Sequence, residues 1–187
     1  MPTRPHHDRT AGVPGRACYS LPTVRFDPAR VTNEIKADLR KNVEATKEFE
    51  RSHFDQVYEA ALLSVSRGGD LAVLFNAIMA LHLPGMTKKK AGAISSSLNS
   101  KATALMTRDQ QLAVDAQYAV WMHSGAPCIP NHRSASDDEF RRADAHKAAN
   151  GRRYEVATGM LIDGRWTRPG VDEGCKCVSR IIIPGLE

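Results

Sequence analysis

The fold of this chain is decided by two stretches in its last third, Trp121-Met122-His123-Ser124-Gly125 and Pro169-Gly170-Val171-Asp172-Glu173-Gly174-Cys175-Lys176-Cys177. Three of the four cysteines and three of the seven histidines lie between Trp121 and Cys177. Short apolar runs alternate there with glycine and proline, which is typical of turns and short strands. A Cys-x-Cys pair directly before a final apolar run is uncommon enough to require a structural cause.

The chain beyond Gly125 is predicted to form a small β-rich subdomain, residues 125–187. Pro127 and Pro130 interrupt any helix that would continue past Gly125, because proline lacks the amide proton that a helix needs. An Asp-Gly pair between two β-prone runs is a strong hairpin signal. The elements expected here are a charged helix over residues 135–149, a hairpin around Asp163-Gly164 and a last strand over residues 177–183.

A helical body is predicted for residues 27–124. Asp27-Pro28 is a strong helix start, since aspartate caps free amides and proline suits the first helical position. Asp70 and Thr87 are expected to cap two later helices. Thr107 begins a capping box, so a further helix is expected from there to about Met122. The expected helices cover roughly residues 28–51, 53–67, 70–82, 88–106 and 107–122.

Residues 1–26 are predicted to form an extended N-terminal arm, because prolines recur in them and apolar periodicity is weak. Such an arm is either a docking strap or a frayed terminus. With the two regions that follow, it completes an α+β protein: a mostly helical body, then a small irregular β-hairpin subdomain at the C-terminus.

The composition, 42% apolar and 25% charged, is that of an ordinary soluble protein. The net charge of +5 is mild, and basic and acidic residues are interleaved, which favours a solvated mixed surface over a dedicated nucleic-acid groove. The longest apolar stretch, Leu71 to Leu83, contains Asn76 and His82 and is too short to cross a membrane. No secretory signal is visible, so the cysteines are expected to be reduced.

The cysteines of the β-rich region predict a structural zinc site. Residues at i and i+2 of an extended chain point to the same face, so the thiolates of Cys175 and Cys177 can converge on one ion. Cys128-x3-His132 can supply the remaining sulfur and nitrogen ligands. A small β region with little apolar core gains most from a metal.

Two other interpretations of these cysteines stay open. One is that they are buried packing thiols, because Cys-x-Cys is not the usual Cys-x2-Cys zinc knuckle. The other is a thiol hydrolase in which Cys128 pairs with His132 or His146. No nucleophile elbow, phosphate loop or His-Glu-x-x-His motif accompanies them, and the chain is therefore not expected to be an enzyme.

Three lysines, Lys88, Lys89 and Lys90, open one of the expected helices. Positive charge at a helix N-terminus opposes the helix dipole. A protein that tolerates this arrangement can use the charge for weak, non-specific DNA contact or for an acidic partner. The alternative is that the lysines are simply solvated.

The order of small motifs from Trp121 onward resembles the C-terminal signature of the phage Mu F-like minor head proteins, the head-morphogenesis family of tailed bacteriophages. The resemblance covers roughly residues 54–187. The family's single histidine corresponds to His132 or His146. The other matching motifs are Trp121, His123-Ser124-Gly125, Asn150-Gly151, Pro169-Gly170 and Cys175-Lys176-Cys177.

This resemblance implies a minor structural protein of the virion, made in the bacterial host cytoplasm and placed in the phage head or at the portal vertex. Its implied partners are the portal protein, the major capsid protein or both. Its implied role is in head morphogenesis, DNA packaging or ejection, with no membrane and no small-molecule substrate. The alternative from another class is a small zinc-binding protein that binds nucleic acid.

Overall fold

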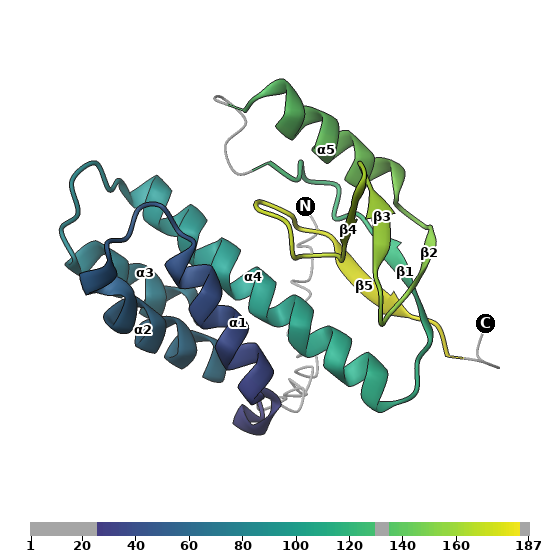
Figure 1. Ribbon diagram of the computed structural model, residues 1–187, viewed down its shortest axis with the longest axis horizontal. Coiled ribbons are helices and arrows are strands. Elements are labelled where there is room, and N and C mark those ends of the chain that lie inside the picture. The colour runs from purple at the N-terminus through teal and green to yellow at the C-terminus, as the bar shows by residue number, and fades with distance from the viewer. Residues whose placement is uncertain (1–25, 130–134, 184–187) are drawn as a thin grey trace, which may run out of the picture.

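A computed structural model describes residues 26–129 and 135–183 of the chain. The N-terminal arm predicted for residues 1–26 lies almost entirely outside these residues, as does His132. In Figure 1 the longest helix, α4, runs through the middle of the molecule, with three helices on one side and a small sheet with a fifth helix on the other. The elements of the helical part are η1 (Pro28–Arg30), α1 (Asn33–Glu44), η2 (Arg51–His53), α2 (Phe54–Ser66), α3 (Leu71–Ala80) and α4 (Lys88–Ala113).

The helix starts follow the capping residues that the sequence indicates. The side chains of Asp70 and Thr87 accept hydrogen bonds from the backbone amides of Ala72 and Lys90, so they cap α3 and α4 as predicted. Asp27 caps the 3₁₀ turn η1 instead of an α-helix, and Thr32 caps α1. The first helix is therefore shorter at both ends than the predicted range 28–51.

The helical body packs around a core contributed by all four helices. One face of α4 closes this core, because its apolar residues recur at helical spacing toward α1, α2 and α3. The buried apolar residues are Val31, Ile35, Leu39, Val43, Phe49, Val57, Ala61, Val65, Leu74, Ile78, Ala91, Leu98, Ala102 and Met106.

The rest of the described chain forms a second unit, which we call the C-terminal module. Its three-stranded antiparallel sheet has β1 in the centre, between β2 and β5, and a separate hairpin joins β3 to β4. Asp163 and Gly164 have positive φ angles of 50° and 74° at the hairpin turn, as the sequence predicts. Its elements are β1 (Tyr118–Met122), α5 (Asp137–Ala148), β2 (Arg153–Glu155), β3 (Met160–Ile162), β4 (Arg165–Thr167) and β5 (Val178–Ile181).

The predicted helix from Thr107 to Met122 is wrong. Helix α4 continues through Thr107 and stops at Ala113, and Asp115 takes a positive φ of 56°. The chain then enters β1, which hydrogen-bonds to strands on both of its edges. In this segment the hydrogen bonds to β2 and β5 stabilise a strand, although the apolar residues have helical spacing. The central strand of the sheet thus comes from within the range 27–124 that was predicted for the helical body.

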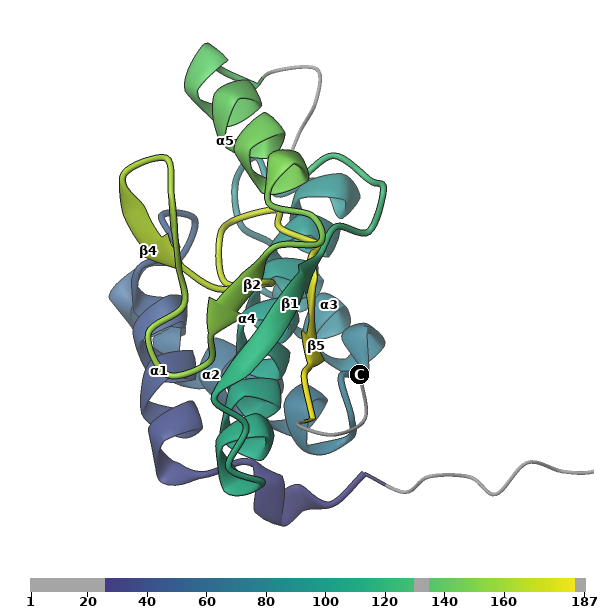
Figure 2. The same cartoon turned by 90° about the vertical axis from the view of Figure 1, so that its right-hand side faces the viewer.

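The C-terminal module rests on the side of α4 that faces away from the helical core. Near the C-terminal end of α4, the side-chain amide Nε2 of Gln111 donates a 2.8 Å hydrogen bond to the hydroxyl of Ser179. A Cβ atom on Gly170 would lie 3.2 Å from the Ala104 side chain, so this glycine permits a close approach to α4. Figure 2 shows β5 lying along α4.

This arrangement confirms the predicted α+β fold class, with a mostly helical body and a small β-hairpin unit after it. Among the described helices, none combines the length and apolar character that a membrane span requires.

Candidate metal centre

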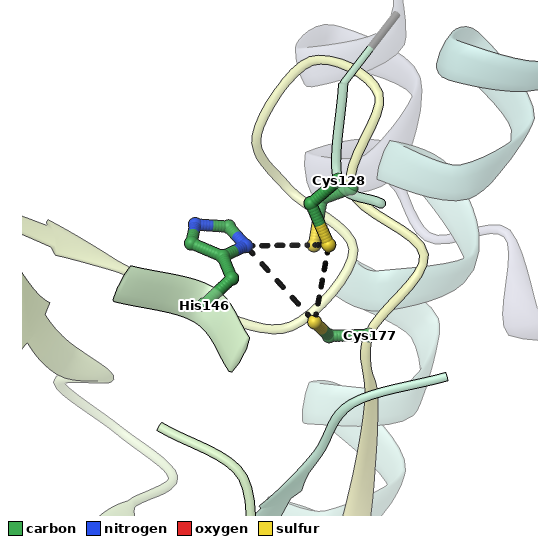
Figure 3. Close-up of side chains that lie close together, drawn as sticks. Cys128, His146 and Cys177 are labelled. Carbon is green, nitrogen blue, oxygen red and sulfur yellow. Dashed lines mark hydrogen bonds between the residues drawn. The ribbon is translucent and has the colours of Figure 1, made fainter. Parts of the chain in front are cut away.

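Four buried side chains of the C-terminal module converge on one point: Cys128, His146, Cys175 and Cys177. Their ligand atoms, three sulfurs and one ring nitrogen, all lie within 4.8 Å of one another. We call this group the Cys3His cluster. Figure 3 shows the sulfurs of Cys128 and Cys177 and the imidazole of His146 turned toward one another.

The separations match the edges of a tetrahedral site. Zinc–sulfur bonds of about 2.3 Å and zinc–nitrogen bonds of about 2.0–2.1 Å imply ligand–ligand distances of roughly 3.5–3.8 Å. The Cys128 sulfur lies 4.0 Å from that of Cys175 and 3.5 Å from that of Cys177. The Nδ1 atom of His146 lies 3.3 Å from the sulfur of Cys175 and 4.0 Å from that of Cys177. The cluster can therefore hold a zinc ion with little rearrangement.

Three segments that are distant in sequence deliver these ligands. Cys128 lies in the segment after β1, and His146 lies in the last turn of α5. Cys175 and Cys177 lie just before β5 and are both buried, whereas Lys176 between them is exposed. This alternation is the one expected of an extended Cys-x-Cys segment.

The charge states of the metal-free cluster show why a cation suits it. Hydrogen bonds with Cys175 and Cys177 lower the pKa of Cys128 far below that of a free thiol. The hydrogen bond with Cys128, together with burial, raises the pKa of Cys175. Thiols packed this closely cannot all ionise together unless a positive charge lies between them. A divalent cation removes this conflict, because it stabilises several thiolates at once.

The histidine is oriented by a carboxylate on its far side. The Nε2 atom of His146 lies 3.0 Å from a carboxylate oxygen of Asp172, and the hydroxyl of Thr167 donates to the same oxygen at 2.8 Å. Burial lowers the pKa of His146, but hydrogen bonds to Asp172 and to the thiols outweigh burial and raise it to about 11. With a metal on Nδ1, the Nε2–H group donates to Asp172, which fixes the ring as a ligand.

Asp172→Ala is expected to weaken zinc binding by about 10- to 100-fold, because outer partners of a metal-bound histidine hold its orientation and basicity. Competition against a chelator of known affinity measures this change. Asp144→Ala is the matched control, since Asp144 is an exposed aspartate on the helix that carries His146. An Asp172→Ala chain that binds zinc as tightly as the unaltered chain would contradict this role.

The residues around the cluster pack it tightly. Trp121 is fully buried on β1, and its ring meets that of His146 edge-on at 5.2 Å between centroids. The backbone amide of Gly170 donates to the sulfur of Cys175 at 3.3 Å. The amide of Gly151 donates to the carbonyl oxygen of Trp121 at 2.8 Å. Trp121 thus anchors the module from a strand and not from the helix that was predicted to run to about Met122.

The predicted zinc ligands and the predicted lysines lie in different parts of the structure. The cluster contains three of the four predicted ligands, Cys128, Cys175 and Cys177. His132 lies outside the described residues, and among those described the nitrogen ligand is His146, the other histidine that the resemblance admits. The lysines Lys88, Lys89 and Lys90 form the first turn of α4. Lys90 pairs with Glu48 at 3.2 Å.

We compared the chain with protein families, with curated proteins and with solved structures. No family model, no curated protein and no solved structure matches the chain.

Proposed function

We propose that the Cys3His cluster holds a structural zinc ion, and that the chain is a minor structural protein of a tailed-phage head. The observation that carries the first part is the convergence of four buried ligand atoms within 4.8 Å. Three sulfurs and one nitrogen form a ligand set that zinc prefers.

Four protein ligands favour a structural ion over a catalytic one. A catalytic zinc keeps one coordination position for water or substrate, whereas a structural zinc has four protein ligands. The cluster supplies all four, and each of its residues is buried. The apolar core of the C-terminal module is small, so the ion would stabilise it where hydrophobic burial is limited. In this proposal the zinc ion has a structural role and not a catalytic one.

The role in the phage head rests on the order of motifs that resembles the Mu F-like family. Residues of three of these motifs lie at or beside the metal centre: Trp121, Gly170 and the Cys175–Cys177 pair. Gly151 of a fourth motif donates a hydrogen bond to the backbone of Trp121. Short motifs that meet at one centre support the family resemblance more strongly than the same motifs scattered over a surface would. In this proposal the zinc centre keeps the C-terminal module folded while the chain binds portal or capsid protein.

Imaging and peptide analysis of purified phage particles and of their assembly precursors test this role. We expect the chain in the particle or its precursors, in contact with the portal or the inner capsid surface. A particle in which cross-linking joins the chain to portal or capsid protein would support the proposal. A chain that is absent from both particles and precursors would contradict it.

A further inference from the structure

A groove of about 430 Å³ lies between α4 and the C-terminal module, and Cys175 and Cys177 of the Cys3His cluster are among its lining residues. One wall is the face of α4 from Ser96 to Gln111. The other wall is formed by two short segments of the C-terminal module, residues 168–170 and 175–179, together with Tyr154 and Val156 of the sheet region. The volume is within the range of small-molecule sites, about 300–1,000 Å³.

The groove is cationic. Its lining includes Arg108, Arg168 and Lys176, and no aspartate or glutamate is among the described residues that line it. The nearest acidic partner of Arg108 is Glu34, at 3.5 Å, and the Glu34 side chain is 68% exposed. Water therefore screens that pairing, and the groove keeps a net positive charge.

The two arginines are held close to each other without full compensation. Arg168 donates hydrogen bonds to the carbonyl oxygens of Val156 and Ala157, which hold its guanidinium in place. Burial, and then the positive charge of Arg108, lower the pKa of Arg168. The Nε–H group of Arg108 is buried and has no hydrogen-bond partner among the described residues. The Arg108 side chain is 24% exposed in all, so its charge remains accessible from the groove although this N–H group is buried.

The wall formed by α4 is polar where it faces the groove. Ser96, Ser100, Thr103 and Thr107 all line the groove, at helical spacings of three and four residues. The opposite face of the same helix carries Leu98, Ala102 and Met106 into the helical core. A row of hydroxyl groups on the same helix as Arg108, with Arg168 on the other wall, is suited to the several acceptor oxygens of a phosphate.

We propose that this groove binds a small molecule that carries a phosphate or pyrophosphate group, with Arg108, Arg168 and Lys176 as its charged contacts. This ligand class is one that the sequence patterns did not predict. A single strand of nucleic acid is a poorer fit, because such sites use aromatic side chains as stacking platforms. Tyr154 is the one aromatic residue among the described lining residues, and it is buried with its hydroxyl bonded to Ser179.

Titration calorimetry of the full chain with sodium pyrophosphate, and separately with inorganic phosphate, tests the proposal. We expect saturable binding that weakens by about tenfold in Arg108→Gln and in Lys176→Gln, the loss of one charge-assisted contact each. Lys176 is exposed, so Lys176→Gln keeps the fold even if Arg108→Gln does not. The matched control is Lys147→Gln, an exposed lysine on α5 outside the groove, with an expected change below about twofold.

Three results would overturn the proposal. The first is the absence of saturable binding of either anion at millimolar concentration. The second is an equal loss of affinity in Lys147→Gln and Lys176→Gln, which would indicate general attraction to a basic surface. The third is binding of a single-stranded oligonucleotide that depends on Arg108 and Lys176 while pyrophosphate does not bind. That result would assign the groove to nucleic acid.

Discussion

Cys177→Ser is expected to weaken zinc binding strongly and to unfold the C-terminal module at zinc concentrations at which the unaltered chain is folded. Structural zinc contributes about 10–16 kcal/mol in small domains, so one of four ligands carries roughly 2.5–4 kcal/mol. This loss corresponds to a decrease in zinc affinity on the order of 100- to 1,000-fold. Metal analysis after gel filtration and the near-ultraviolet circular dichroism of the chain measure the two effects.

Cys18→Ser is the matched control for this experiment. The four residues of the cluster already complete a tetrahedral ligand set without Cys18, so this variant is expected to keep its zinc. Equal zinc affinity of the Cys177→Ser and unaltered chains, measured by competition with a chelator, would contradict the assignment of Cys177 as a ligand.

Trp121→Ala is expected to destabilise the chain by about 3–5 kcal/mol, the usual loss for removing a large buried aromatic side chain. Trp121 is fully buried, and its ring contacts those of His146 and Tyr154 at centroid distances of 5.2 Å and 6.1 Å. The cavity would also free the His146 ring to move, so zinc affinity is expected to fall. Urea denaturation at fixed zinc concentration measures the change in the free energy of unfolding.

The second tryptophan provides the control. Trp166 is 66% exposed on β4, and Trp166→Ala is expected to change the free energy of unfolding by no more than about 0.5 kcal/mol. Trp121→Phe is expected to be milder than Trp121→Ala, because it keeps a ring and removes an N–H group that has no partner among the described residues. Similar losses in Trp121→Ala and Trp166→Ala would contradict the anchor role of Trp121.

Local signals in the sequence were sufficient for much of the fold. Asp70 and Thr87 cap helices because a side-chain oxygen reaches an amide two or three residues away. The Asp163-Gly164 turn is equally local, since both residues tolerate positive φ. Such features depend on a few neighbouring residues, so the sequence alone predicts them.

Strand β1 was not predicted, because its extended conformation depends on pairing with strands that are distant in sequence. Ala116, Ala119 and Val120 continue the apolar spacing of α4, and no glycine or proline separates them from that helix. The helix nevertheless ends at Ala113, and the following residues pair with β2 and β5. The β-prone run of Tyr118 to Met122 was the available sign of a strand.

The sequence could not decide between His132 and His146 as the nitrogen ligand, because that choice also depends on the packing of distant segments. His132 is close to Cys128 in sequence, and short spacing is the usual guide to a zinc ligand. His146 reaches the cluster through the packing of α5 against the rest of the module, which no local spacing encodes. One sign was available, because Ala143 and His146 occupy the inward face of an otherwise charged helix.

X-ray absorption at the zinc edge of the purified, reduced chain tests whether the Cys3His cluster holds zinc. We expect one zinc ion per chain, with three sulfur ligands at about 2.3 Å and one nitrogen ligand at about 2.0–2.1 Å. A reduced chain that holds no stoichiometric zinc after incubation with the metal would contradict this expectation. A zinc ion bound mainly by oxygen would contradict it equally.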